Sequence, residues 1–131
     1  MSMSAYHLAM VLAVVDDLLF SSKIRAVAAG ASEAVTFVRT PGGVTAACAE
    51  HQPRLVLIDL DRDTLNPIET IAMIRAMPAP VPRIVAFGAH VNVDRLRAAR
   101  QAGADQAMAR SAFVAALPGL LGAAGTESRE R

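Results

Sequence analysis

The sequence predicts a single α/β domain in which strands and helices alternate around a parallel sheet. Five short apolar segments, each suited to a buried strand, alternate with segments whose apolar residues recur at helical spacing. The chain has 131 residues, the size of one compact domain, and 53% of them are hydrophobic, which is enough for one core. Strict alternation of this kind favours a parallel sheet with helices on both faces.

The five predicted strands are short and mostly apolar. They are, in chain order, Ala9–Val15, Ala34–Val38, Arg54–Leu60, Arg83–Phe87 and Ala107–Ala109. The first strand, AMVLAVV, is apolar throughout, which is typical of a strand buried on both faces. We therefore expect the sheet to lie between two layers of helices.

The predicted helices follow the strands. They span residues 18–29, 44–51, 67–77, 91–102 and 111–121. Asn66 is expected to cap the third of these helices, which Pro67 opens. Ser111 is expected to cap the last helix in the same way.

The two ends of the chain lie outside the predicted strands and helices. We expect a flexible leader at residues 1–8, a folded domain at 9–122 and a flexible tail at 123–131. No apolar run reaches the ~18 residues that a membrane span needs, and no signal peptide is recognisable, so we expect a cytoplasmic protein without membrane contact. The net charge of +1 and the lack of a basic, aromatic-rich face argue against nucleic-acid binding.

Acidic residues gather where two of the predicted strands end. Asp16 and Asp17 follow the first strand, Asp59 lies at the end of the third, and Asp61 and Asp63 stand on the next loop. In a sheet of flavodoxin-like order these strands are neighbours, and ligands bind outside their carboxyl ends. Like charges this close repel unless a cation or a proton relieves them, and oxygen ligands suit Mg²⁺. We therefore predict a Mg²⁺ site, with helix capping or a solvated rim as the structural alternative.

The sequence resembles the receiver domain of bacterial two-component response regulators. The resemblance rests on VLAVVDD, RLVLIDLDRD, PRIVAFGAH and AGADQAMARSAF, and it covers residues 10–121. It implies a flavodoxin-like (CheY-like) doubly wound, five-stranded parallel sheet of order 2-1-3-4-5. It also implies that Asp16, Asp17 and Asp59 bind Mg²⁺ weakly, together with the backbone carbonyl of Asp61, and that Asp59 is the phosphoacceptor.

The sequence departs from the receiver pattern at the positions whose side chains contact the phosphoryl group in that family. Gly88 stands where the family has Ser or Thr, and Arg110 stands where it has a lysine that pairs with the phosphoryl oxygens. Arginine keeps the charge but differs from lysine in length and shape. Lys23, the only lysine, belongs to the first helix, far along the chain from Arg110, and Ala107 replaces the aromatic switch residue. These departures imply an atypical receiver, or pseudo-receiver, with an impaired switch.

Three functions stay open at this point. The first is an atypical single-domain receiver that acts as a phosphorelay and protein-interaction module, with Asp59 as a phosphoacceptor. The second is a fully active, Mg²⁺-dependent phosphoacceptor receiver. The third is a small-ligand-binding domain of the same fold, although the segment after the first strand lacks the phosphate-binding patterns of flavin and dinucleotide sites. No Ser/His/Asp or Cys/His set is apparent, so catalysis is expected to extend at most to self-phosphorylation and autodephosphorylation at Asp59.

The expected partners are proteins. The resemblance implies a histidine kinase or another signalling protein. The last helix, FVAALPGLLGAA, is more apolar than an exposed helix should be, which favours a homodimer or another partner there. His90, in the loop after the fourth strand, is expected at the surface, with a place in the pocket as the alternative.

Overall fold

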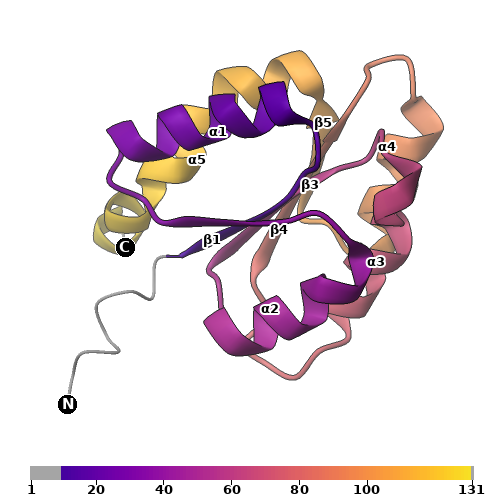
Figure 1. Ribbon diagram of the computed structural model, residues 1–131, viewed down its shortest axis with the longest axis horizontal. Helices are drawn as coiled ribbons and strands as arrows, with labels where there is room; N and C mark the ends of the chain where they lie inside the picture. The colour runs from indigo at the N-terminus through magenta and orange to yellow at the C-terminus, as the bar shows by residue number, and fades with distance from the viewer. Residues whose placement is uncertain (1–9, 131) are drawn as a thin grey trace.

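A parallel sheet of five strands forms the centre of residues 10–130, which are the residues that the computed structural model describes (Figure 1). The strands are β1 (Val11–Val14), β2 (Val35–Val38), β3 (Leu55–Asp59), β4 (Arg83–Gly88) and β5 (Gln106–Ala109). They lie in the order β2-β1-β3-β4-β5, and every neighbouring pair is parallel. The predicted doubly wound fold of order 2-1-3-4-5 is confirmed.

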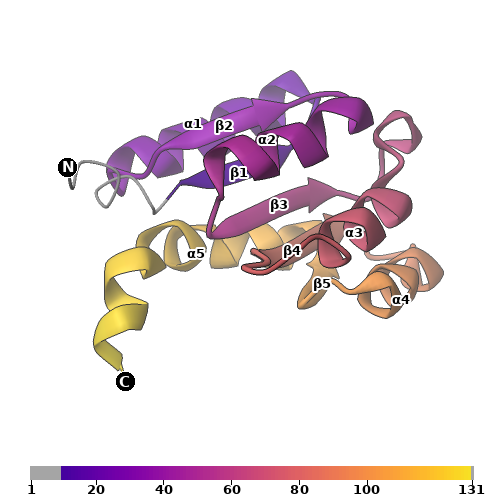
Figure 2. The ribbon, with the colours of Figure 1, turned by 90° about the horizontal axis from the view of Figure 1, so that it is seen from below.

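Helices cover both faces of the sheet. Over the described residues they are α1 (Leu18–Gly30), α2 (Val44–His51), α3 (Pro67–Arg75), α4 (Val93–Ala102) and α5 (Arg110–Glu130), with the short 3-10 helices η2 (Pro41–Gly43) and η3 (Asp63–Leu65). Helices α1 and α5 cover one face, and α2, α3 and α4 cover the other (Figures 1 and 2). This arrangement follows from the alternation of strands and helices along the chain.

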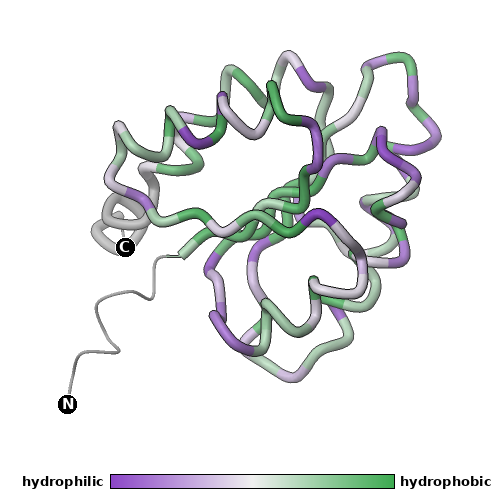
Figure 3. Tube along the Cα trace, in the orientation of Figure 1, coloured by the Kyte–Doolittle hydropathy of each residue, from purple (hydrophilic) through white to green (hydrophobic). Residues whose placement is uncertain are grey.

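The sheet separates two apolar cores. On one face it packs against Phe20 of α1 and against Phe113 and Leu117 of α5. On the other face it packs against Ile71 of α3 and Ala99 of α4. Figure 3 shows apolar residues concentrated along the central strands. All residues of β1 and β3 are buried, as expected for strands covered on both faces.

Two helix starts and one helix cap differ from those predicted. Ser111 does not cap the last helix, because α5 already begins at Arg110. Asn66 precedes α3, but it has a left-handed backbone with a φ of 45° and its side chain makes no capping hydrogen bond. Helix α4 begins at Val93, two residues later than predicted, because the backbone N–H of Asn92 closes a turn just before it.

The last helix buries its apolar side within the domain. Its buried residues are Phe113, Leu117, Leu120 and Leu121. These residues belong to the core that also contains Ile24 of α1. The composition that suggested a partner for this helix is thus largely explained by contacts inside the chain, and a homodimer through α5 stays a prediction without that support.

The ends of the chain bear on three further predictions. The predicted leader, residues 1–8, lies outside the described residues. Helix α5 runs to Glu130, beyond its predicted end near Leu121, and the flexibility of residues 123–131 stays a prediction.

Among the helices of the described residues, none is long and apolar enough to span a bilayer.

Three phenylalanines form an aromatic cluster between α1, β4 and α5. The ring centroids of Phe20 and Phe87 are 5.0 Å apart, and those of Phe87 and Phe113 are 4.1 Å apart. Phe113 is fully buried, so the loss of its ring leaves a cavity as well as unburied apolar area.

We expect Phe113→Ala to lower the free energy of unfolding by about 3–5 kcal/mol. Urea denaturation followed by circular dichroism measures this change. Leu19→Ala is the control, because Leu19 is 85% exposed. Its substitution should change the same quantity by less than about 0.5 kcal/mol. Equal effects of the two substitutions would contradict the described core.

Candidate functional site

The candidate site lies at the carboxyl ends of the strands. Strands β1 and β3 are neighbours there, at the point where the chain order of the sheet reverses. Asp16 and Asp17 follow β1, Asp59 ends β3, Gly88 ends β4, and Arg110 follows β5. The structure therefore brings these five predicted site residues to the same edge of the sheet.

Asp59 is the buried acid of the site. Its side chain is fully buried, and its Oδ1 accepts a hydrogen bond from the backbone N–H of Asp61 at 2.9 Å. Burial raises the pKa of Asp59, and the hydrogen bond from Asp61 and the positive charge of Arg110 oppose this rise only in part. A cation beside Asp59 therefore favours the charged form of this buried carboxyl group.

Arg110 supplies that cation and shares it between two carboxylates. Its Nη2 lies 3.2 Å from Oδ1 of Asp59 and 3.0 Å from Oδ2 of Asp61. Its Cζ lies 4.7 Å from the ring centroid of Phe20 and 5.3 Å from that of Phe87. Contacts of this kind between a cation and aromatic faces stabilise by about 0.5–2 kcal/mol. The sequence predicted the place of Arg110 but not the two rings that support it.

Asp61 turns its side chain into the site. Its oxygens accept the backbone N–H of Ala89 at 2.9 and 3.1 Å, Nδ2 of Asn92 at 3.4 Å, and Nη2 of Arg110 at 3.0 Å. Burial by itself raises the pKa of Asp61, but these hydrogen bonds outweigh burial and the net pKa is lowered. Asp61 is therefore held as a charged carboxylate. The role of its backbone carbonyl as a metal ligand stays a prediction.

The acidic pair after β1 has other partners. Asp16 forms an ion pair with Arg62, whose Nε lies 2.8 Å from Oδ1. Asp17 caps α1, because its Oδ1 accepts the backbone N–H groups of Leu19 at 2.9 Å and Phe20 at 3.2 Å. Asp17 therefore acts as a helix cap, which was the predicted structural alternative to metal binding.

The carboxylates do not form a metal centre in this arrangement. Within the described residues, no three Asp, Glu, His or Cys side chains come together closely enough to hold an ion. Asp16 and Asp59 are each paired with an arginine instead. Binding of Mg²⁺ would therefore require Asp16 to leave Arg62, and the predicted Mg²⁺ site stays a prediction.

Gly88 is buried at the end of β4 and lies against the loop after β3. A Cβ atom at this position would lie 3.1 Å from Oδ1 of Asp61 and 3.2 Å from Cβ of Leu60. The carbon–carbon distance of 3.2 Å is shorter than the ~3.5–4.0 Å of an optimal contact. The carboxylate of Asp61 therefore lies in tight contact with the position that a Cβ atom on residue 88 would take.

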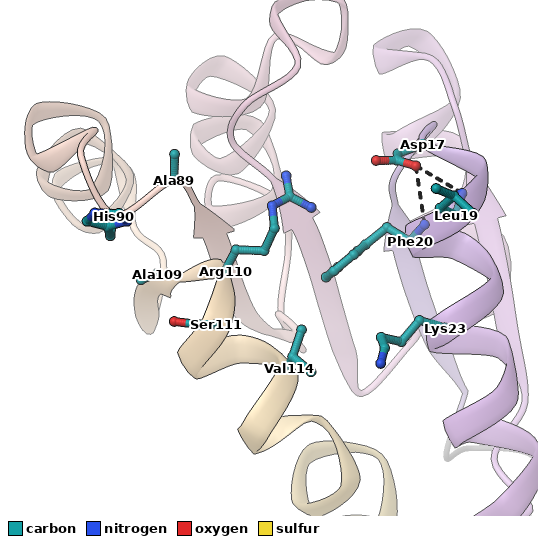
Figure 4. Close-up of a pocket in the computed structure, with 10 residues that line it drawn as sticks. All are labelled: Asp17, Leu19, Phe20, Lys23, Ala89, His90, Ala109, Arg110, Ser111 and Val114. Atoms are coloured by element: carbon teal, nitrogen blue, oxygen red, sulfur yellow. Dashed lines mark hydrogen bonds between the residues drawn. The ribbon is translucent and has the colours of Figure 1, made fainter.

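A cavity of about 760 Å³ opens beside these residues, between α1, the loop after β4 and the start of α5 (Figure 4). Leu19, Phe20 and Val114 give it apolar walls, and Lys23, His90 and Arg110 add polar groups. Lys23 is distant from Arg110 along the chain, yet α1 brings it to the same cavity. His90 was expected either at the surface or in the pocket. It is exposed and also lines the cavity.

Comparison by sequence finds no relative. No protein-family model matches the chain, and no curated protein matches it either.

Solved structures share the fold. A response regulator from Hahella chejuensis superimposes with a TM-score of 0.71 at 22% identity, over 88% of this chain and 93% of that chain. For a response regulator from Chloroflexus aurantiacus the TM-score is 0.75 at 17% identity, over 88% and 98%. For a receiver domain from Bermanella marisrubri it is 0.69 at 20% identity, over 77% and 84%. The chain therefore has the fold of response-regulator receiver domains.

Proposed function

We propose that the chain is an atypical single-domain receiver, a signalling module that binds a partner protein and carries a phosphoacceptor, Asp59, with an impaired switch. The observation that carries the proposal is the pairing of buried Asp59 with Arg110 at the carboxyl end of β3, in a receiver fold. A carboxylate beside a fixed cation can act as a nucleophile toward phosphorus, because the cation offsets the charge of the incoming group.

The two oxygens of the buried Asp59 carboxyl differ in how they are hydrogen-bonded. Its Oδ1 is held by the backbone of Asp61, whereas Oδ2 has only a longer contact, 3.4 Å, with Nη2 of Arg110. In the proposed step Oδ2 forms a bond to phosphorus, and the leaving group departs with the electron pair of the broken bond and takes up a proton. Arg110 pairs with the phosphoryl oxygens in place of the lysine found in receivers.

The response to phosphorylation is expected to be weak. Gly88 offers no hydroxyl to the phosphoryl group, which removes a hydrogen bond to a charged group worth about 1.5–3 kcal/mol. Ala107 has no ring that could change its position between two states. The backbone of Ala89, in the loop that would have to move, is already bonded to Asp61.

The proposed partner is a histidine kinase or another signalling protein. Apolar side chains are exposed beside the cavity, on α1 and on the loop after β4. Leu18 is 70% exposed, Leu19 is 85% exposed, and Val91, next to His90, is 73% exposed. Exposed apolar residues grouped around a cavity are typical of an interaction surface.

Small-ligand binding is the second candidate, and the cavity is the observation that favours it. Its volume of about 760 Å³ is within the range of ligand pockets, about 300–1,000 Å³. Among the described residues, Lys23 contributes an amino group with no ion-pair partner. A ligand with an apolar body and an anionic group near Lys23 and Arg110, away from Asp17, would suit these walls.

The first prediction from the proposal concerns Asp59. Incubation with acetyl phosphate and Mg²⁺ should give a slow, incomplete gain of about 80 Da, the mass of one phosphoryl group, in the intact protein. Asp59→Asn should abolish the gain. Asp63→Asn should keep it, because the Asp63 side chain is 85% exposed and pairs with Arg95. Amide exchange over residues 88–102 should change little on phosphorylation.

Two outcomes would contradict this proposal in different ways. If no labile adduct forms in the unmodified chain, Asp59 is not a phosphoacceptor under these conditions. If the adduct forms completely and amide exchange over residues 88–102 changes strongly, the chain is a fully active receiver.

The second prediction concerns Mg²⁺, for which we propose weak binding because Asp16 must leave Arg62 to become a ligand. A half-exposed ion pair is worth about 0.2–1 kcal/mol, so Arg62→Ala should tighten Mg²⁺ binding by about 1.5- to 5-fold. Amide shifts in a Mg²⁺ titration measure the affinity. Arg97→Ala is the control, since it removes an equal charge that pairs with Asp94 on α4. Equal changes in the two variants would mean that Asp16 is not a ligand.

A further inference from the structure

Hydrogen-bond donors from two elements converge on the carboxylate of Asp61. The backbone N–H of Ala89 reaches both of its oxygens, at 2.9 and 3.1 Å. Nη2 of Arg110 adds a charged donor at 3.0 Å, and Nδ2 of Asn92 adds a longer contact at 3.4 Å. A backbone amide and a guanidinium around one point form an anion-binding site.

This anion-binding site lies directly beside Asp59. The same atom, Nη2 of Arg110, lies 3.2 Å from Oδ1 of Asp59 and 3.0 Å from Oδ2 of Asp61. A group attached to Asp59 could therefore reach Arg110, but the carboxylate of Asp61 already occupies the donors there.

The carboxylate of Asp61 also gives a reason for glycine at position 88. A Cβ atom at position 88 would lie 3.1 Å from Oδ1 of Asp61, a tight contact, so a serine or threonine here would require that oxygen to shift by a few tenths of an ångström. The backbone conformation does not call for glycine, because Gly88 is not among the residues with positive φ. Glycine at this position therefore avoids a tight contact with the side chains of Asp61 and Leu60.

We propose that Asp61 is a built-in occupant of an anion site formed by Ala89, Asn92 and Arg110, and that Gly88 makes room for it. The ligand class that the site excludes is a tetrahedral oxyanion, such as a phosphoryl group or free phosphate. The loop after β4 is thus held in its anion-bound arrangement without phosphorylation. The consequence for phosphorylation rests on the proposed function of Asp59, whereas the anion site itself does not.

A purely structural role for Asp61 makes a different prediction. If Asp61 only connects the loop after β3 to the loop after β4, its removal makes the loop after β4 more mobile and no anion binds in its place. If Asp61 fills an anion site, its removal leaves donors that a free anion can bind. The substitution also removes one negative charge beside Asp59, which favours an incoming anion. Gain of anion binding therefore separates the two roles.

The test is a titration of the ¹⁵N-labelled full chain with inorganic phosphate at constant ionic strength, followed at the amide of Ala89. An intramolecular competitor acts at an effective concentration of millimolar or more, so Asp61→Ala should bind phosphate at least about tenfold more tightly than the unmodified chain. Asp63→Ala should behave like the unmodified chain, because its exposed carboxylate does not contact Ala89. Unchanged binding in Asp61→Ala would overturn the proposal.

Asp61→Asn protects the test against loss of folding. It keeps the shape of the side chain and removes its charge, so it should also bind phosphate more tightly than the unmodified chain. If both Asp61 variants are folded and neither gains phosphate binding, the anion site is refuted.

A double-mutant cycle tests the pairing of Gly88 with Asp61. Gly88→Ala should lower the urea midpoint of the unmodified chain, because its Cβ meets Oδ1 of Asp61. In the Asp61→Ala background the same substitution should lower the midpoint clearly less. Equal losses in both backgrounds would show that the carboxylate is not what requires glycine.

The phosphate titration and the phosphorylation experiment can fail separately. Free phosphate binds without a reaction at Asp59, so the titration tests the anion site alone. One outcome is that Asp61→Ala gains phosphate binding while acetyl phosphate modifies neither this variant nor the unmodified chain. That result would support the anion site and contradict the proposal that Asp59 is a phosphoacceptor. If both proposals hold, acetyl phosphate should modify Asp59 faster in Asp61→Ala than in the unmodified chain.

Discussion

The functional edge of this domain depends on one guanidinium group shared by two carboxylates. Asp59 is fully buried, and burial alone disfavours its charged form. Arg110 offsets that cost, and it is itself held against Phe20 and Phe87 of the aromatic cluster. The same rings pack α1 and β4 in the core, so the geometry of the charged site is fixed by apolar packing. Loss of Arg110 would leave Asp61 and Asp59 as two neighbouring carboxylates with no nearby cation between them.

The choice of arginine at position 110 has a physical reason beyond its charge. A lysine could also stand between Asp59 and Asp61, but its ammonium is compact and strongly hydrated and does not stack on aromatic rings as a planar guanidinium does. The rings of Phe20 and Phe87 favour the planar group. The departure from the receiver pattern at this position is thus matched by its surroundings, and it leaves Lys23 as a separate cation on the far side of the cavity.

The sequence predicted the fold well because the fold depends on features that repeat along the chain. Apolar strands and amphipathic helices define the layers, and the ends of parallel strands bring Asp59 and Arg110 to one edge. The pairing of Asp16 with Arg62 and the ring platform of Phe20 could not be predicted in the same way. They depend on side-chain directions and on contacts between segments far apart in the sequence. The predicted starts of α4 and α5 were wrong, and the side-chain cap expected of Asn66 is missing although α3 begins at Pro67 as predicted.

Gly88, which departs from the receiver pattern, is coupled in space to Asp61. In the sequence alone the two residues look unrelated. Gly88 is a position without a hydroxyl, and Asp61 is one of several acidic residues that follow the third strand. In the structure the carboxylate of Asp61 stands against the position where a side chain on residue 88 would begin, and it binds the next backbone N–H, that of Ala89. A side chain at position 88 would press on the carboxylate of Asp61, whose oxygen would have to shift by a few tenths of an ångström. Because the two positions are in direct contact, we expect substitutions at Gly88 and Asp61 to be non-additive, although the two residues are far apart in the chain.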